Sequence, residues 1–342
     1  MTNKEIARQL GISPAALSII INHKNGVSEA TRARVLSELK KMGLDSLVKK
    51  VTPAVSPSIS FIIYKRNGGI LDYHPFFLLL MEHIETRAAK SGYGIMLSTI
   101  DKRKPIEPQI ERINQQNSQG AIIFATEMFP EDLAAFDRLT IPYVTLDNDF
   151  SCLPCNSVAI NNSMGTYQAI SHLVENGHKR IGYLKSTNRI SSFDERQEGY
   201  EKALAAYQLS FREEDIWNVD YSEEGSYRDL RDKLASIKKK DYPDAFVCDD
   251  DTIAVGAIRA FTEAGLSIPE DISIIGFNDR PTCEMTDPML TSVNVPKATF
   301  AMEAVDSLIS ILNSESEAAL TRSRKVRIGT RLVIRGSVSR RP

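Results

Sequence analysis

Acidic, amide and guanidinium side chains gather where short apolar runs of this sequence end. They are Asp147-Asn148, Asp249-Asp250-Asp251, Asn278-Asp279 and Arg196, and the phenol of Tyr221 falls in a comparable loop. Carboxylates, amides and guanidiniums can hold vicinal hydroxyls through paired hydrogen bonds. The segment from Tyr64 to Phe77 adds Tyr73, Phe76 and Phe77, aromatic side chains that can cover the apolar face of a sugar ring. The predicted chemistry is the binding of a small polyhydroxylated molecule.

The apolar runs that precede these residues are expected to be β-strands. The candidate strands are 59–64, 93–98, 120–124, 142–146, 180–184, 245–248 and 272–276, and amphipathic stretches such as 76–90, 163–176, 193–207 and 251–264 lie between them. This alternation predicts parallel sheets with covering helices. About ten such units exceed one ordinary sheet, so we expect two α/β lobes. Because open α/β sheets bind ligands beyond the carboxyl ends of their strands, the polar residues would face a cleft between the lobes.

Each acidic residue of this set could instead cap a helix. We expect Asp251 to be the N-cap of a helix over 252–264 and Asp250 to face the cleft. The same alternative applies to Asp279.

Length and composition describe a multidomain globular protein. The chain has 342 residues, which predicts two or three domains, with 42% hydrophobic and 25% charged residues. Four cysteines fit a reducing compartment. No apolar run approaches the ~20 residues that span a bilayer, and Thr2-Asn3-Lys4-Glu5 stands where a signal peptide would begin. We therefore expect a cytoplasmic location.

Charge divides the chain into a basic and an acidic part. Residues 1–58 hold nine Lys or Arg and four Asp or Glu, a net charge of +5, whereas the rest carries −7. A small basic segment attached to a larger acidic one indicates that the basic segment meets a polyanion.

The first 43 residues, here called the head, have the spacing of a helix-turn-helix. Thr2 and Glu5 form a capping box, Gly11 can turn the chain, and Ser13-Pro14 starts a second helix that runs to about Asn22. Ser28 caps a third helix that ends at Gly43. A helix-turn-helix can place its second helix in the major groove of DNA. The alternative is a helical hairpin that only packs on the rest of the chain.

Few side chains of the second helix can read base edges. Ser13, Ser18 and Asn22 remain for phosphates or bases, and Ala15 and Ala16 can touch thymine methyls. We expect phosphate contacts to supply much of the affinity. The candidate DNA-binding residues are Thr2, Ser13, Ala15, Ala16, Ser18, Asn22, Lys24, Ser28, Thr31, Arg32 and Leu47.

Signatures along nearly the whole chain resemble the LacI family of transcription repressors. They include Glu5-Ile6-Ala7, Gly11-Ile12-Ser13, Val27 to Arg32, His172-Leu173, Gly177 to Tyr183, Arg196 with Gly199-Tyr200, Asp250-Asp251, Pro269 to Asp279, Pro288 to Val293 and Leu332 to Ser337. The resemblance implies a homodimer whose heads bind a pseudo-palindromic operator. It also implies a periplasmic-binding-protein-like body that senses a small effector.

The resemblance further implies domain limits and effector contacts. Residues 44–58 would be a hinge or linker, and the body, residues 59–337, would cross between lobes three times. The near lobe would hold about 59–159 plus 291–321, and the far lobe about 160–290 plus 322–337. Together with the cleft residues above, the candidate effector contacts are Tyr64, Asp72, Phe76, Phe77, Asp147, Arg196, Tyr221, Asp250 and Asn278.

Two positions depart from the family pattern. The family usually has a basic side chain where this chain has Ile19, so bases would be read differently here. The hinge usually reads Tyr-x-Pro-Asn followed by Ala-Arg-x-Leu, whereas residues 44–50 read Leu-Asp-Ser-Leu-Val-Lys-Lys. Leu47 is the candidate for the apolar wedge that such hinges insert into the minor groove.

Two other classes of function are alternatives. An enzyme acting on a sugar or nucleoside is the main alternative, but the sequence has no P-loop, Gly-x-Gly-x-x-Gly loop or Gly-x-Ser-x-Gly elbow. A transport receptor fits the body but not the head. Cys152 and Cys155 lack a second pair or a nearby histidine, so no zinc site is expected there. We also expect no cofactor. The favoured hypothesis is an effector-controlled repressor, with a sugar as effector.

Overall fold

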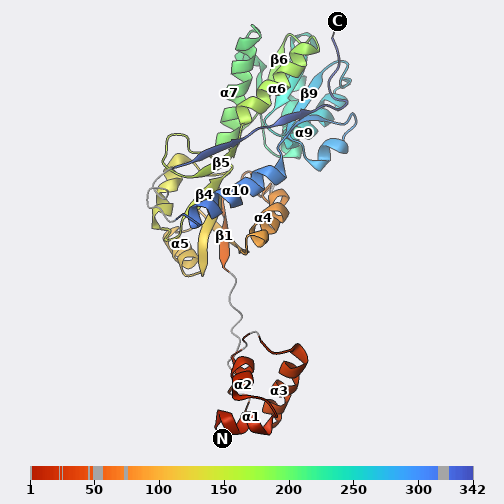
Figure 1. The fold of residues 1–342 in the computed structure, drawn as a ribbon. Helices are drawn as coiled ribbons and strands as arrows, with labels where there is room; N and C mark the ends of the chain where they lie inside the picture. The colour runs from red at the N-terminus through yellow and green to blue at the C-terminus, as the bar shows by residue number, and fades with distance from the viewer. Residues whose placement is uncertain are drawn as a thin grey trace. The chain divides into compact units, whose positions relative to one another are not determined.

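The computed structural model describes residues 2–22, 24, 26–44, 47–48, 57–72, 76–314 and 323–341. The chain divides into two compact units, Met1–Ser56 and Pro57–Pro342 (Figure 1). Most of the linker predicted over 44–58, namely residues 45–46 and 49–56, lies outside the described residues. Val48 packs against the apolar core of the first unit, and Ser58 is already the first residue of a strand.

The first unit is a three-helix head. Its helices are α1 (Asn3–Gln9), α2 (Pro14–Ile21) and α3 (Glu29–Lys41). They begin at the predicted hydroxyl caps Thr2, Ser13 and Ser28, each of which accepts a backbone amide of the first turn. Gly11 turns the chain between α1 and α2 at a φ of +63°, which favours glycine. One small core joins the helices: Ile6, Ala7, Leu10, Leu17, Ile20, Val35 and Leu39. The predicted helical head is confirmed.

The second unit, the body, contains two β-sheets. In the first sheet the strands lie in the order β11-β5-β4-β3-β1-β2, and all neighbours are parallel. Its strands are β1 (Ser58–Lys65), β2 (Gly94–Asp101), β3 (Ser118–Phe124), β4 (Tyr143–Leu146), β5 (Ser157–Ile160) and β11 (Lys325–Ile328).

The second sheet has the order β12-β10-β9-β8-β6-β7. Its neighbours are parallel except for β12, which runs antiparallel to β10. Its strands are β6 (Ile181–Ser186), β7 (Ile216–Val219), β8 (Ala245–Cys248), β9 (Ser273–Asn278), β10 (Thr291–Asn294) and β12 (Arg331–Val333).

Helices cover both faces of each sheet, and buried apolar clusters lie between the helices and the sheets. The helices are α4 (Leu78–Lys90), α5 (Glu107–Asn114), α6 (Asn162–Glu175), α7 (Ser191–Ala206), α8 (Glu223–Ser236), α9 (Asp251–Glu263) and α10 (Lys297–Leu312), with short 3-10 helices η2 (Pro130–Arg138), η3 (Glu213–Asp215), η4 (Lys239–Asp241) and η5 (Pro281–Glu284). On the first sheet, α4 and α10 pack together; on the second, α6 packs on α7 and α8 on α9.

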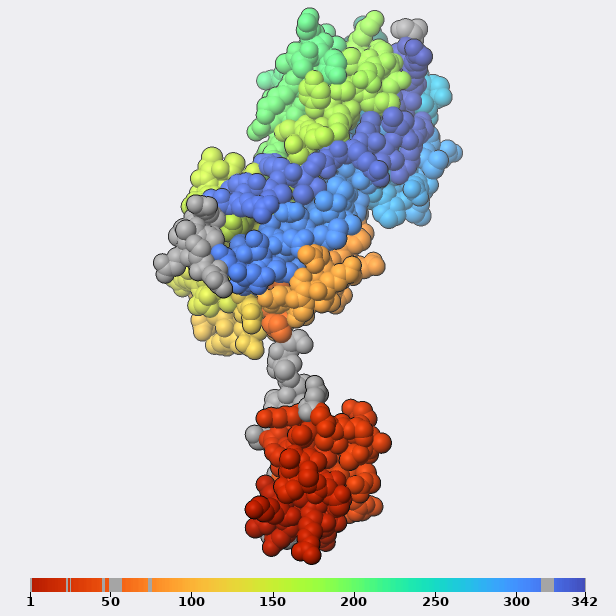
Figure 2. All heavy atoms as spheres, in the orientation of Figure 1, coloured from red at the N-terminus to blue at the C-terminus, as the bar shows by residue number. Residues whose placement is uncertain are grey.

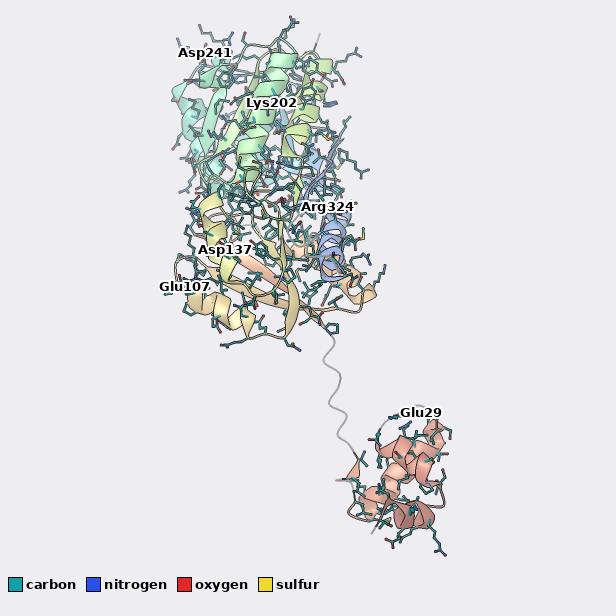
Figure 3. All side chains as sticks on the ribbon, turned by 60° about the vertical axis from the view of Figure 1, so that its left-hand side comes forward. Glu29, Glu107, Asp137, Lys202, Asp241 and Arg324 are labelled. Carbon is teal, nitrogen blue, oxygen red and sulfur yellow. The ribbon has the colours of Figure 1, made fainter. Side chains whose placement is uncertain are left out.

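We call the part built on the first sheet the first lobe and the part built on the second sheet the second lobe. Figure 3 separates them: Glu107 and Asp137 lie on the first lobe, and Lys202 and Asp241 on the second. The predicted pair of parallel α/β lobes is therefore confirmed. None of the described helices is long and apolar enough to cross a membrane.

The chain crosses between the lobes at positions that differ from the predicted lobe limits. Within the described residues it passes from β5 to α6, from β10 back to α10, and from β11 to β12. Strand β10 pairs with β9, so 291–294 belongs to the second lobe and not to the near-lobe segment 291–321. Strand β11 pairs with β5, so 325–328 belongs to the first lobe. In Figure 2 the dark-blue C-terminal segment accordingly runs along both lobes.

Candidate functional site

A cavity lies between the two lobes of the body. Its volume is about 30 Å³, which holds about one or two water molecules, so the lobes lie close together here. The first lobe contributes Ile70, Leu71, Phe76, Thr126, Asp147 and Ile160, and the second lobe contributes Ile190, Ser192, Phe193, Arg196, Tyr221, Asp250, Asn278 and Arg280. Six of the nine effector residues predicted from the sequence are in this set.

The ends of parallel strands bring the polar lining together. Asp147 follows β4, Asp250 comes two residues after β8, and Asn278 ends β9. Asp147 has a φ of 76° and Asn278 a φ of 98°, in the left-handed region that non-glycine residues rarely adopt. Such strained backbone concentrates at functional sites, where the surrounding structure holds it in place.

Asp250 has two roles at once. It is the N-cap of α9, and its Oδ1 accepts from the Thr252 amide at 2.8 Å and from Thr252 Oγ1 at 2.6 Å. Its Oδ2 accepts from Asn278 Nδ2 at 2.5 Å and from Arg280 Nη2 at 3.1 Å. Burial opposes the charge, but Arg280 and the Thr252 hydrogen bonds outweigh it and hold the pKa of Asp250 below its usual value. A carboxylate offers about four acceptor sites, and all four are in use.

The expected N-cap at Asp251 is wrong, because Asp250 provides the cap and Asp251 is the first residue of α9. Asp251 is buried beneath the cavity and accepts from Ser292 Oγ at 2.6 Å and from the Arg280 amide at 2.9 Å. Burial and the charge of Asp250 raise the pKa of Asp251 to about 7. Its role is to position the loop that carries Arg280.

Arg196 is held rigidly at the cavity. Its Nε donates to Asn162 Oδ1 at 3.0 Å, and its Nη1 donates to the Asp249 carbonyl oxygen. The guanidinium lies over the Phe277 ring, 3.8 Å from the ring centre, and it also faces Phe193. These cation–π contacts fix the direction of the remaining donors.

Asp147 is the lining carboxyl group that gains a proton most readily. It is buried, and its Oδ2 accepts from Thr126 Oγ1 at 2.6 Å. Burial raises the pKa of Asp147 to about 6, with Glu195 adding to the shift and Thr126 and Arg196 opposing it. The first lobe therefore supplies a group that can either accept or donate near neutral pH.

Arg280 is a cavity residue that the sequence analysis missed. It is only 6% exposed, and it donates from Nη1 to Thr252 Oγ1 at 3.0 Å and from Nη2 to Tyr221 Oη at 3.2 Å. Its Nε is buried and makes no hydrogen bond to any described residue. Arg280 lies two positions beyond Asn278, so the strand-end rule could have found it had the loop been followed further.

Three predicted effector residues lie elsewhere. Tyr64 points to the face of the first sheet opposite Ile63, because side chains alternate along β1, and it packs on Phe136. Asp72 pairs with Lys65 and is half exposed, and Phe77 packs on Phe124 in the core. None of the three lines the cavity. Tyr73 lies outside the described residues.

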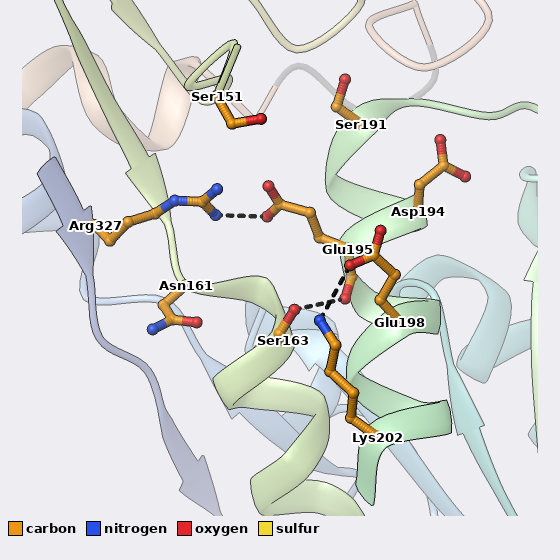
Figure 4. Close-up of a pocket in the computed structure, with 9 residues that line it drawn as sticks. All are labelled: Ser151, Asn161, Ser163, Ser191, Asp194, Glu195, Glu198, Lys202 and Arg327. Carbon is orange, nitrogen blue, oxygen red and sulfur yellow. Dashed lines mark hydrogen bonds and ion pairs between the residues drawn. The ribbon is translucent and has the colours of Figure 1, made fainter. Parts of the chain in front are cut away.

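A second hollow of about 490 Å³ lies on the other side of α7 (Figure 4). There Arg327 Nη1 donates to Glu195 Oε2 at 2.8 Å, and Ser163 Oγ donates to the Glu195 carbonyl oxygen at 3.0 Å. Ser192, Phe193 and Arg196 of α7 face the inner cavity, whereas its Ser191, Asp194 and Glu195 face this hollow. The start of α7 thus separates the two spaces.

In the head, the predicted DNA-binding residues fall into two groups. Thr2, Ser13 and Ser28 use their hydroxyl oxygens as helix caps. Arg32 Nη2 donates to the Lys24 carbonyl oxygen at 2.5 Å, and Thr31 Oγ1 contacts Ser28 Oγ at 2.8 Å.

The other group leaves side chains accessible. Asn22 Nδ2 donates to the Ser18 carbonyl oxygen at 2.8 Å, which ties the end of α2 to its middle. Leu47 is 38% exposed. Exposed or half-exposed positions are Ala15, Ala16, Ser18, Asn22, Lys24 and Leu47. The face of α2 opposite the buried Leu17 and Ile20 is therefore available for contact.

Comparison with known proteins gives full-length relatives. Residues 170–338 match the periplasmic binding protein-like domain family. The chain is 28% identical to the HTH-type transcriptional repressor PurR of Actinobacillus pleuropneumoniae serotype 3 over 311 residues, which cover 90% of each chain. It is also 28% identical to PurR of Photorhabdus laumondii over 347 residues, which cover 98% of this chain and 96% of the relative.

Solved structures share the fold over most or nearly all of the chain. The lac repressor dimer bound to operator and the anti-inducer ONPF superposes with a TM-score of 0.76 at 23% identity, with 99% of each chain covered. The transcriptional regulator CelR in complex with cellobiose gives a TM-score of 0.69 at 23% identity, covering 98% of this chain and 99% of that one. A LacI family regulator from Enterococcus faecium with bound ribose gives 0.68 at 25% identity, covering 83% and 100%.

Proposed function

This chain belongs to the LacI family of transcriptional regulators, and from that premise we propose that it is a repressor whose affinity for operator DNA is set by a small effector bound between the lobes. The observation that carries the proposal is the presence, in one chain, of a basic three-helix head and a two-lobed body with a buried polar cavity. The relatives are transcriptional repressors, which sets the enzyme hypothesis aside.

The head supports DNA binding through α2. Its buried side chains Leu17 and Ile20 fix the helix on the head core, so that Ala15 and Ser18 stay exposed on its outer face. Small side chains on this face allow the helix backbone to approach the groove closely, and Ala15 can touch a thymine methyl. The positive net charge of residues 1–58 supplies the phosphate attraction.

The cavity supports a polyhydroxylated effector. Arg196, Asn278 and Asp147 present donors and acceptors from both lobes, and Phe76 and Phe193 add aromatic surface. A ligand held by both lobes favours one arrangement of the lobes over the other, which is what effector control requires. The related structures with cellobiose and ribose support a carbohydrate.

We further propose that the chain works as a homodimer on a pseudo-palindromic operator, in the cytoplasm. Strand β2 is the edge of the first sheet, and it and the neighbouring α4 expose large apolar side chains. Leu78 of α4 is 58% exposed and Leu97 of β2 is 57% exposed. Leu79 of α4 and Met96 of β2 are also exposed. A second copy of the chain is the proposed occupant, because a two-fold dimer presents two heads to two half-sites.

The test is selection of DNA from a random pool by the full chain, followed by anisotropy titration at several salt concentrations. We expect a pseudo-palindromic consensus and an affinity that falls by at least tenfold between 50 and 200 mM salt. Ser18→Asp places a negative charge on the outer face of α2 and should abolish binding. Ser37→Asp makes the same change at an exposed position of α3 and is the matched control. Equal effects of the two substitutions would contradict the proposed surface.

A further inference from the structure

The proposed function does not say which chemical class of sugar the cavity binds, and the side chain of Arg280 bears on that question. The inference rests on that function, because it concerns the effector that binds between the lobes. We propose that the effector is an acidic sugar derivative whose oxyanion, a carboxylate or a phosphate ester, is recognised by Arg280. Arg280 is then a specificity-determining residue for the ligand class.

The carboxylate of Asp250 is not free to bind a sugar hydroxyl. Both of its oxygens are occupied by donors of the protein: Thr252 on Oδ1, and Asn278 and Arg280 on Oδ2. A carboxylate with four bound donors has no acceptor site left for a sugar hydroxyl. The group that would otherwise hold vicinal hydroxyls is therefore committed to holding Arg280 and Asn278 in place.

Arg280 keeps one N–H donor that no described residue accepts. The side chain lines the cavity and is only 6% exposed. Its Nε has no hydrogen-bond partner among the described residues. Its other nitrogens are fixed by Thr252, Tyr221 and Asp250, so the guanidinium cannot turn away. A fixed guanidinium with an unmatched N–H is suited to an oxyanion, which accepts charge-assisted hydrogen bonds better than a neutral hydroxyl does.

The lining of the cavity has as many basic as acidic side chains. It holds two guanidiniums, Arg196 and Arg280, and two carboxyl groups, Asp147 and Asp250. Asp250 and Arg280 compensate each other's charge as an ion pair at 3.1 Å, and Lys297, which contacts the Asn278 carbonyl oxygen at 2.7 Å, lies near the carboxylates of Asp279 and Asp251.

Asp147 is the remaining negative charge of the lining. Its pKa of about 6 lets it take up a proton when an anion enters. The charged groups that act on it are Arg196, which stabilises its negative form, and Glu195, which opposes that form. When Asp147 is protonated, the cavity can therefore bind one anionic group of a ligand without placing it next to an unpaired carboxylate of the lining.

The experiment is isothermal titration of the full chain with matched sets of sugars. Each set contains a neutral sugar, its uronic acid and its 6-phosphate: glucose, glucuronate and glucose 6-phosphate, and the corresponding galactose set. We expect an acidic member to bind at least tenfold more tightly than its neutral partner. The affinities of the uronic acid and of the 6-phosphate show whether the bound oxyanion is a carboxylate or a phosphate ester.

Substitutions then assign the preference to Arg280. Arg280→Gln should lower affinity for the acidic member at least tenfold and leave the neutral member within threefold, and Arg280→Lys should restore part of the preference. Arg259→Gln removes an exposed guanidinium of α9 that pairs with Glu224, and it should change neither affinity. Thermal melts of each variant establish that it is folded.

Three results would overturn the inference. They are equal or tighter binding of the neutral members, an equal loss for both members in Arg280→Gln, and no binding of any acidic member. None of them affects the proposed function if the same protein still binds its selected DNA in a salt-dependent way. Loss of that DNA binding, by contrast, is a failure of the proposed function itself.

Discussion

Arg327 of β11 and Glu195 of α7 form an ion pair at 2.8 Å that joins the first lobe to the second. Glu195 Oε2 also accepts from Asn162 Nδ2 at 2.9 Å, and Asn162 Oδ1 accepts from Arg196 Nε at 3.0 Å. A continuous chain of hydrogen bonds therefore leads from a crossing between the lobes to a residue of the cavity. A movement of the lobes that breaks the ion pair removes the contact of Glu195 with the first lobe and leaves Glu195 joined to Asn162, the partner of Arg196.

This link predicts a specific effect of Glu195→Gln. Arg327 is 35% and Glu195 24% exposed, so the pair adds less than about 1 kcal/mol to stability. Effector affinity should change by about threefold to tenfold, because Arg196 loses part of its support. Titration of the best-binding sugar against Glu195→Gln and against Glu198→Gln is the check. Glu198 pairs within α7 with Lys202 and does not bridge the lobes, so its variant should match the wild type.

Asp250→Ala should be strongly destabilising. It removes a helix cap and leaves the buried Arg280 without its carboxylate, and breaking a buried ion pair in this way costs about 3 to 5 kcal/mol. Urea unfolding of the full chain measures the loss. Asp232→Ala, at an exposed position that pairs with the adjacent Arg231, should change the free energy of unfolding by less than about 0.5 kcal/mol. Similar losses in both variants would contradict the network described around Asp250.

Asp147 predicts a pH dependence of stability. Its folded pKa of about 6 lies above the ordinary value of 3.8, so the folded state binds the proton more tightly. Its contribution therefore favours folding below about pH 4 and is lost as pH rises to about 6. Asp147→Asn should raise the free energy of unfolding at pH 7.5 by about 1 to 3 kcal/mol and have little effect at pH 4. Denaturation curves at both pH values test this, and a pH-independent difference would show that Asp147 is not the titrating group.

Two serines of the head separate stability from recognition. Ser13 Oγ accepts from the Ala16 amide at 3.0 Å, so Ser13→Ala should destabilise the head by about 1 kcal/mol. Ser18→Ala removes an exposed hydroxyl of α2 and should weaken DNA binding with less effect on stability. Thermal melts and anisotropy titrations of both variants are the measurements. Loss of stability in Ser18→Ala equal to that in Ser13→Ala would contradict the assignment of the two roles.

The sequence predicted most elements of the body because their patterns are local. All seven candidate strands occur, for example 59–64 as β1 and 245–248 as β8. Strands β5, β7 and β10 were not among the candidates, and because the predicted β4 and β8 also have four residues, their shortness alone does not explain the omission. The lobe of β10 depends on its pairing with β9, and sequence spacing does not determine such a pairing.

Cavity residues that follow the ends of strands could be predicted from the sequence. Residues whose position depends on tertiary packing could not. Asp147, Asp250 and Asn278 follow strands and meet at the cavity. Tyr64 was placed by its proximity to a strand end, but the alternation of side chains along β1 directs it to the other face of the sheet. Arg280 reaches the cavity only because its loop folds back onto Asp251, which its backbone amide contacts at 2.9 Å.

The most direct test of effector control is a single anisotropy titration of selected operator DNA by the full chain, with and without a sugar shown to bind the body. Coupling between two sites is typically about 1 to 3 kcal/mol. We predict that a saturating concentration of the sugar changes operator affinity by at least fivefold, and that Arg196→Ala removes the change without altering affinity in the absence of sugar. An operator affinity that stays the same when the sugar saturates the body would contradict the account.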